Sequence, residues 1–157
     1  MRGSTRILFI IFIMNIEKQI EMAVSDAVTE KPIKIKVGNK RFTINPPTIG
    51  KMQILSKYYL MLDLDEEKLQ ENPQLEAIRV CRDKSDIVTE LMAVATFNNK
   101  DDLLNDDKIK ERAEYFKWNS KVEDFSMVLL ALLTQTQYEN FIISIRLTEI
   151  LRQNKPK

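Results

Sequence analysis

Apolar and polar residues alternate in two short runs, one on each side of Gly38-Asn39. This alternation predicts two β-strands, and a Gly-Asn dipeptide between them is typical of a two-residue hairpin loop. The loop sets a register in which the apolar residues of both strands share one face: Val37 pairs with Lys40, Ile35 with Phe42 and Ile33 with Ile44. The opposite face then carries polar side chains: Lys34, Lys36, Arg41 and Thr43. Because two strands alone are only marginally stable in water, the apolar face must pack on helices or on a partner.

Helical periodicity follows the hairpin. Pro46 and Pro47 cannot donate backbone hydrogen bonds, so they end the strand pairing, and Thr48 can cap a helix that runs to about Leu62. One face of this helix gathers apolar residues: Ile49, Met52, Leu55, Tyr59 and Leu62. The next segment, residues 63–72, is an acidic connector.

A second helix is predicted from the cap Asn72, with Pro73 at its first position, to residue 97. Lys84 interrupts its apolar arc, because a rotation of about 100° per residue places this side chain in the middle of the buried face. Either the helix breaks at residues 83–85, or Lys84 extends past the apolar surface to reach a carboxylate. We favour a break or kink, after which one of two polar residues caps the helix again: Ser85 or Asp86.

The following residues predict two further helices. Residues 98–105 lack periodicity and predict a loop, after which a short amphipathic helix is expected. Ser120 and Glu123 have the spacing of a capping box and predict the start of the next helix. Because residues 125–133 are apolar except for Ser126, this helix should form the buried centre of the bundle.

The last predicted helix, residues 136–152, is apolar on two sides. One stripe consists of Tyr138, Phe141, Ile142 and Ile145. The other consists of Ile143, Leu147, Ile150 and Leu151. Either both stripes are buried between two parts of one core, or one of them accepts a partner, because monomers seldom expose contiguous apolar patches. The second stripe is the candidate partner-binding site.

These elements predict a mainly α fold, in which an N-terminal two-stranded β-hairpin precedes a compact bundle of about five helices. The length of 157 residues suits a single domain, which we place at residues 31–153, with a tail at residues 154–157. Residues 1–30 form an N-terminal extension, which we interpret as disordered or as a misassigned start. Its apolar run Ile7–Met14 is about half the length that crosses a bilayer, so a short membrane or partner anchor is the less favoured alternative.

The residue types present restrict the chemistry. The chain has no histidine, which excludes imidazole bases, Ser-His and Cys-His pairs and most zinc sites. The single Cys81 excludes an internal disulfide and is interpreted as a structural thiol in a reducing cytoplasm. The acidic connector resembles a calcium loop but has Lys68 where a glycine is required. We therefore predict a protein that is not an enzyme, with no catalytic residues, cofactor or metal.

The distribution of charge raises a second hypothesis. Lys and Arg number 24 and Asp and Glu 23, so no overall field favours nucleic acid. Residues 31–57 nevertheless carry only basic charges. The second hypothesis is nucleic-acid binding, in which four side chains of the hairpin contact phosphates: Lys34, Lys36, Lys40 and Arg41. Because Phe42 points to the apolar face and cannot stack on bases, nucleic-acid binding is the weaker alternative, and no nucleic acid or membrane partner is predicted.

The order of these elements resembles that of phage tail assembly chaperones, specifically the small helical type from phages and prophages of Bacteroidetes-like hosts. Three segments carry the resemblance: Pro-Pro-Thr-Ile-Gly-Lys-Met at residues 46–52, Cys-Arg-Asp-Lys-Ser-Asp-Ile-Val at residues 81–88 and Val-Glu-Asp-Phe at residues 122–125. The resemblance covers roughly residues 31–150 and leaves the N-terminal extension outside.

The resemblance implies a non-enzymatic protein of the infected cell's cytoplasm. Such chaperones coat the long, aggregation-prone tail tape measure protein until tail tube subunits replace them, and they are not usually kept in the virion. The implied partner is therefore the tape measure protein, with self-association left open. A small structural or adaptor protein of a phage or mobile element is the alternative.

Overall fold

The computed structural model describes residues 32–135 together with residues 150 and 153. A two-stranded antiparallel sheet precedes a series of helices, which confirms the predicted fold class. The strands are β1 (Ile33–Val37) and β2 (Lys40–Ile44), and the helices are α3 (Ile49–Leu62), α4 (Glu66–Glu71), α5 (Pro73–Asp83), α6 (Ser85–Thr96), α7 (Lys100–Leu103), α8 (Asp106–Asn119) and α9 (Val122–Gln135). The N-terminal extension and nearly all of the predicted last helix lie outside the described residues.

The hairpin has the predicted register. Val37 pairs with Lys40, Ile35 with Phe42 and Ile33 with Ile44. Along β1 the apolar side chains are buried and the lysines between them are exposed, so the strand has one inner and one outer face. The apolar face packs on the helices, as the marginal stability of two isolated strands requires.

The hairpin loop depends on glycine. Gly38 has a φ of 60°, whereas Asn39 keeps a negative φ, and this combination is typical of a type II′ turn. A Cβ atom at Gly38 would lie 2.6 Å from the Tyr115 hydroxyl oxygen of α8. Both the backbone conformation and the close approach of α8 therefore require glycine at this position.

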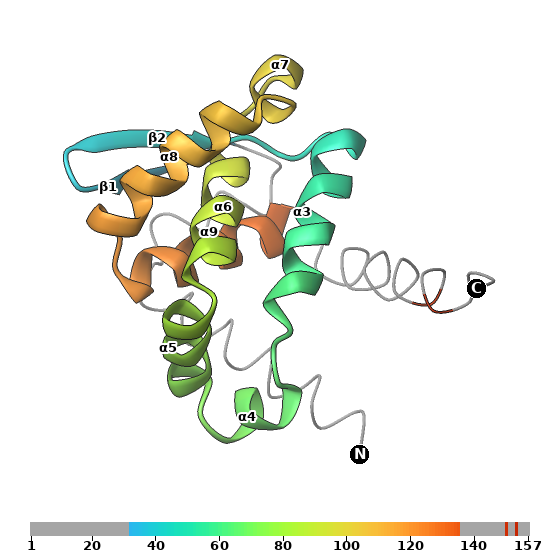
Figure 1. The fold of residues 1–157 in the computed structure, drawn as a ribbon, viewed down its shortest axis with the longest axis vertical. Helices are drawn as coiled ribbons and strands as arrows, with labels where there is room; N and C mark the ends of the chain where they lie inside the picture. Colours follow the sequence, from blue (N-terminus) through green and yellow to red (C-terminus); the bar gives the residue numbers. More distant parts are fainter. Residues whose placement is uncertain (1–31, 136–149, 151–152, 154–157) are drawn as a thin grey trace.

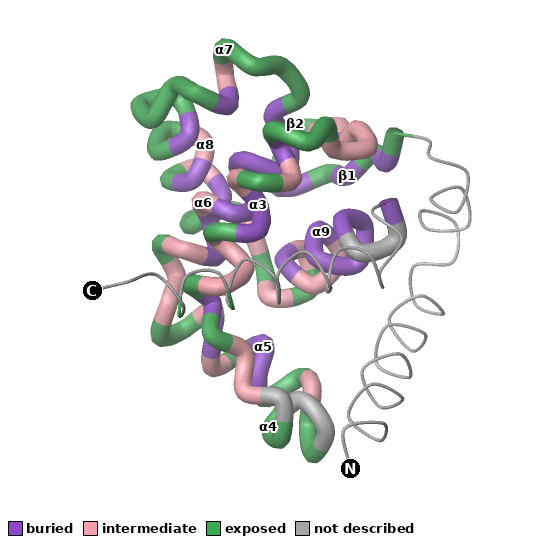
Figure 2. The backbone as a smooth tube through the Cα atoms, turned by 90° about the vertical axis from the view of Figure 1, so that its right-hand side faces the viewer, coloured by how far each residue is buried: buried purple, intermediate pink, exposed green. Residues whose placement is uncertain are grey.

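Helix α6 is the centre of the fold. Figure 1 shows it between α3 and α8, and it also packs against α5, α9 and β2. Every residue from Leu91 to Phe97 is buried. Helix α9 supplies the second buried layer through Phe125 and residues 128–132, as predicted, and Figure 2 shows the buried stretches of α9 and β1. None of the helices in the described part of the chain is long and apolar enough to cross a membrane.

The predicted break at Lys84 is confirmed as a kink between α5 and α6. The backbone N–H of Lys84 donates to the Val80 carbonyl, and the Lys84 carbonyl accepts from the Val88 N–H, so one hydrogen bond lies on each side of the bend. The Lys84 ammonium donates to the carbonyl of Met61 at the end of α3 (3.0 Å). The prediction that Ser85 or Asp86 caps α6 again is wrong, because Lys84 occupies the cap position and the start of α6 has no side-chain cap.

The start of α9 differs from the predicted capping box. Asp124, not Glu123, closes the box by accepting a hydrogen bond from the backbone N–H of Lys121 (2.7 Å). The reason is a shift of one residue: Ser120 still donates its N–H to Phe116 of α8, so Lys121 takes the position before the helix.

Three other expectations from the sequence are corrected. The acidic connector contains the short helix α4, and the predicted loop at residues 98–105 contains α7. Thr48 caps α3 as predicted, but Ile49 is 89% exposed and does not belong to its buried face. Ile49 is the first residue of α3, so its side chain lies beyond the surface that α6 covers.

Candidate functional site

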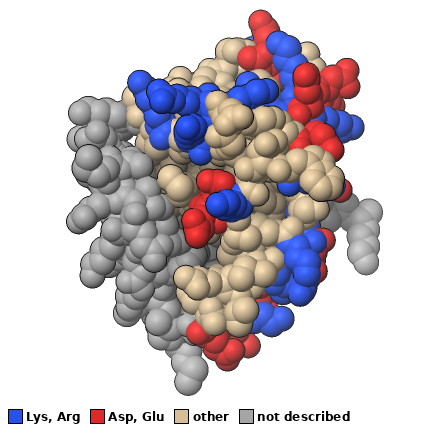
Figure 3. Space-filling view, turned by 90° about the vertical axis from the view of Figure 1, so that its left-hand side faces the viewer, with Lys and Arg blue, Asp and Glu red and all other residues tan. Residues whose placement is uncertain are grey.

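The outer face of the hairpin is cationic. Lys34, Lys36 and Arg41 are exposed, and none of them forms an ion pair within the part of the chain that the structure describes. Lys36 lies directly opposite Arg41 in the sheet. Figure 3, which faces the hairpin, shows Lys and Arg side chains clustered in its upper part. Like charges on directly opposite residues destabilise a sheet, so hairpin stability does not explain this arrangement.

The inner face is anchored by aromatic contacts. The ring of Phe42 lies 4.8 Å from that of Phe116, centroid to centroid, and Phe116 is fully buried. Tyr115 donates its hydroxyl to the Val37 carbonyl (2.8 Å). The Arg112 guanidinium stacks over Phe97 at 3.6 Å, and burial lowers its pKa. Phe42 therefore points inward, as predicted, and is not available to stack on a base.

The edge of β2 is covered near its C-terminal end. The Asn98 side chain donates to the Thr43 carbonyl (2.8 Å) and accepts from the Asn45 N–H (3.1 Å). The Gln135 amide of α9 donates to the Ile44 carbonyl (2.7 Å). Side chains from α9 and from the residues that follow α6 thus satisfy backbone groups along this edge and its end.

Among the described residues, none bonds to the edge of β1. The two-residue loop closes on a hydrogen-bonded pair, Val37 and Lys40, and hydrogen-bonded pairs then alternate along the antiparallel ladder. The N–H and C=O groups of Lys34 and Lys36 therefore point away from β2. No hydrogen bond to these four groups is formed within residues 32–135. Unpaired edge groups of this kind can accept a further strand.

Lys51 is a buried cation that the sequence did not reveal. It is 3% exposed, and its ammonium donates to the Ala95 carbonyl (2.8 Å) and to the Asn98 side chain (3.1 Å). Burial lowers its pKa to about 8. Because both acceptors hold the amine away from solvent, it links α3 to the end of α6 and does not present a nucleophile.

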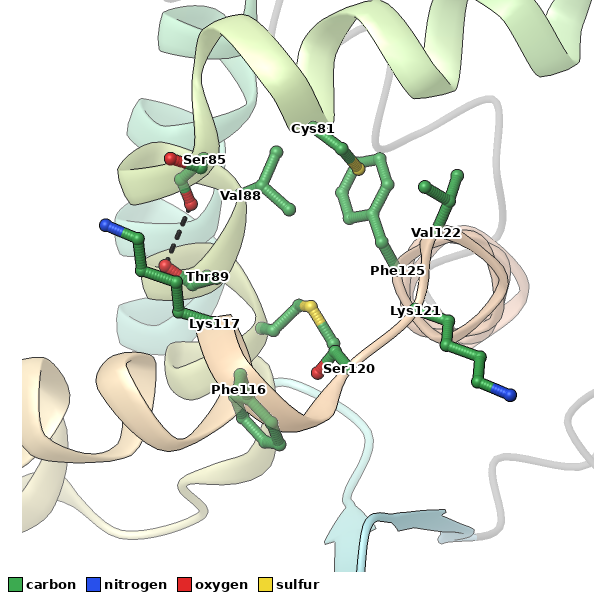
Figure 4. A pocket seen from close by; sticks show the side chains of 11 residues that line it. Cys81, Ser85, Val88, Thr89, Phe116, Lys117, Ser120, Lys121, Val122 and Phe125 are labelled. Carbon is green, nitrogen blue, oxygen red and sulfur yellow. Dashed lines mark hydrogen bonds between the residues drawn. The ribbon is translucent and has the colours of Figure 1, made fainter.

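A small cavity of about 150 Å³ lies where the α5–α6 kink faces the end of α8 and the start of α9. Its walls are mainly apolar and include Val88, Phe116 and Phe125 (Figure 4). Burial raises the pKa of the Cys81 thiol to about 11, which keeps it protonated at neutral pH. Ser120 Oγ is buried without a hydrogen-bond partner in the described structure. The Lys117 ammonium at the rim bonds to Asp86 and not to Ser120 Oγ.

The sequence-based candidate site is mostly outside the described residues. Of the stripe Ile143, Leu147, Ile150 and Leu151, the structure describes Ile150 alone, which is 51% exposed. No group of acidic or cysteine residues in the described ranges could hold a metal ion. No protein-family model matches the chain, and no curated protein or solved structure is significantly similar to it.

Proposed function

We propose that the protein is a non-enzymatic phage tail assembly chaperone, which binds and shields the tail tape measure protein in the host cytoplasm. The observation that carries the proposal is the cationic outer side of the hairpin, where Lys36 and Arg41 lie opposite each other and neither forms an ion pair within the described residues. An assembly chaperone needs such a reversible interface, because its client is later transferred to the tail tube.

Two features support a protein as the partner. The open edge of β1 offers backbone hydrogen bonds, which an extended chain can satisfy whatever its sequence. Large apolar side chains are also exposed on several helices, including Ile49, Leu75 and Trp118, which is 75% exposed. A long client that must stay unfolded presents many extended segments and apolar side chains to these surfaces. The resemblance of residues 31–150 to tail assembly chaperones supplies the identity of the client.

Co-expression with the tape measure protein of the same phage or prophage, followed by affinity capture, tests the proposal. We expect co-purification and an increase in soluble tape measure protein. Replacing Lys34, Lys36 and Arg41 by glutamine should reduce capture. The matched control replaces three exposed lysines on the helices, Lys57, Lys100 and Lys110, and should leave capture unchanged. Undiminished capture by the hairpin variant would exclude the hairpin face as the site.

The predicted stripe on the last helix is tested in the same assay. Ile143→Asp and Leu147→Asp should each weaken capture if that stripe contacts the client, because a carboxylate is costly in an apolar interface. Mass spectrometry of purified virions distinguishes a chaperone, which is absent from the particle, from a structural protein, which is retained.

Nucleic-acid binding is the second candidate, favoured only by the basic hairpin face. A gel shift with single-stranded and double-stranded DNA at low salt tests it, since such binding depends mainly on neutralised phosphates. A salt-sensitive shift that the hairpin variant abolishes would support it over the chaperone proposal.

A further inference from the structure

We infer that the open edge of β1 binds an extended acidic segment of the partner, which adds to the hairpin as a third strand. In this arrangement carboxylates at alternate positions of the segment lie beside Lys34 and Lys36. The inference rests on the proposed function and defines the chemistry of the partner segment.

The length of the edge limits the segment. Lys34 and Lys36 each present an N–H and a C=O away from β2, as the ladder requires. Pro32 precedes β1 and has no N–H to donate, and the turn at Gly38 follows it. The edge is therefore short, with two consecutive pairs of donors and acceptors, and a partner segment of only a few residues covers it.

The charge on the outer face determines the composition of the segment. Side chains on one face of a strand recur every second residue, so an added strand places every second side chain beside the lysines. The same residues of that strand form the hydrogen bonds to the edge groups of Lys34 and Lys36. Opposite charges on neighbouring strands are stabilising and like charges destabilising, which selects glutamate or aspartate at these positions.

A second copy of this chain is the less suitable occupant. Two β1 strands that paired edge to edge would place the lysines of one copy beside those of the other, because both edges carry the same residues. Natural proteins place lysines on exposed strand edges for this reason, since repulsion between their charges prevents two edges from pairing. The edge therefore discriminates between a copy of itself and an acidic strand.

Figure 1 shows the two strands side by side, and the outer edge of β2 is partly occupied. Asn98 occupies the carbonyl of Thr43 and the N–H of Asn45 beside β2. An added strand at β2 would have to displace this side chain, which also accepts a hydrogen bond from the buried Lys51. The inference is therefore specific to β1.

The test uses the full chain and a ten-residue peptide, capped at both ends, in which glutamate and threonine alternate. Fluorescence anisotropy should show binding that weakens as salt is added, because exposed charge pairs are screened. A second peptide carries lysine in place of glutamate and should not bind. A third carries N-methyl groups on the glutamate nitrogens, which removes the N–H donors that face the edge and keeps every carboxylate, and its binding should be lost.

Two variants of the protein separate charge from hydrogen bonding. Replacing Lys34 and Lys36 by glutamine should raise the Kd about fivefold, the effect of two exposed charge pairs, whereas replacing Lys57 and Lys110 should not. Lys36→Pro removes the outward N–H without removing a bond to β2, a position at which an edge strand tolerates proline. It should weaken binding more than Lys36→Gln, while circular dichroism confirms that the fold is retained.

The outcomes keep the two proposals apart. Equal binding of the N-methylated peptide would overturn strand addition and leave a purely electrostatic contact. Capture of the tape measure protein without any binding of the acidic peptide would overturn this inference and leave the proposed function standing. Binding of the peptide without capture of the tape measure protein would support the edge site and contradict the proposed client. Binding of single-stranded DNA that displaces the acidic peptide would assign the face to nucleic acid and overturn the inference.

Discussion

The two sides of the hairpin differ in the contacts that their side chains make. On the inner side, Phe42 packs against the fully buried Phe116, and Tyr115 donates a hydrogen bond to the Val37 carbonyl. On the outer side, the cations have no ion-pair partners in the described structure, and the edge of β1 has no strand beside it.

This difference indicates that the inner side stabilises the fold and that the outer side is available to bind a partner. A two-stranded sheet needs a packed face to persist, and the helices supply it entirely from the inner side. The outer side is then free to carry groups that do not help folding. Variants on the two sides should therefore affect different measurements: inner variants the free energy of unfolding, and outer variants the capture of a partner.

The largest expected effect is on the inner side. Phe116→Ala should lower the free energy of unfolding by about 3–5 kcal/mol, because it leaves a cavity between Phe42 and α6. Urea unfolding followed by circular dichroism measures the change. Trp118→Ala is the matched control on the same helix and should cost less than about 0.5 kcal/mol, since this indole is largely exposed. Similar losses for both variants would contradict the assignment of Phe116 to the core.

The second expected effect concerns the covered edge. Asn98→Ala should lower the free energy of unfolding by about 2 kcal/mol, because Thr43, Asn45 and Lys51 all lose a hydrogen-bond partner. The amide of Asn45 should also exchange faster with solvent, which NMR measures residue by residue. Asn119→Ala serves as the control, because its exposed amide bonds only to a carbonyl of its own helix. Unchanged exchange at Asn45 would show that Asn98 does not protect this edge.

Lys51 makes the free energy of unfolding depend on pH. Burial lowers its pKa to about 8, whereas a lysine in an unfolded chain has a pKa of about 10.4. Below pH 8 the ammonium is charged in both states, and its desolvation weakens the fold. As the pH rises from about 8 to about 10.4, the unfolded state binds more protons, so the free energy of unfolding increases.

The comparison of wild type with Lys51→Met at pH 7.5 and pH 10 isolates this effect. We expect the wild type to gain about 1–2 kcal/mol relative to the variant at the higher pH. Urea unfolding at both pH values measures the difference, and other titrating groups cancel because both proteins contain them. A difference between the two proteins that does not change with pH would show that the Lys51 ammonium is not desolvated.

Local patterns in the sequence were sufficient for much of the fold. The hairpin register follows from side-chain alternation, because a shift by one residue would expose Ile33 and Ile35. The kink at Lys84 follows from a charged side chain at a buried helical position. The start of α5 was also predictable from neighbouring residues, because Asn72 caps the helix by accepting a hydrogen bond from the Leu75 N–H and Pro73 occupies its first position.

The features that the sequence did not reveal depend on residues far apart in the chain. Lys51 is separated by 44 residues from Ala95, whose carbonyl accepts a hydrogen bond from the Lys51 ammonium. Asn98 caps a strand edge 55 residues away, although its position in the sequence predicts only a loop. That Asn98 occupies part of the edge of β2, and not the edge of β1, likewise depends on where Asn98 lies in the fold.

The smallest expected change in stability is the most informative about the outer side. Lys36→Glu places a carboxylate opposite Arg41 and should raise the free energy of unfolding by about 0.2–1 kcal/mol, because it replaces a like-charged pair by an opposite one. The same variant should bind the acidic peptide and the tape measure protein less well. Lys57→Glu makes the same change in net charge on α3 and should alter neither quantity. If the like-charged pair is kept for recognition, Lys36→Glu should raise the free energy of unfolding and weaken binding. A variant that is less stable and binds equally well would show that Lys36 stabilises the hairpin and does not contact a partner.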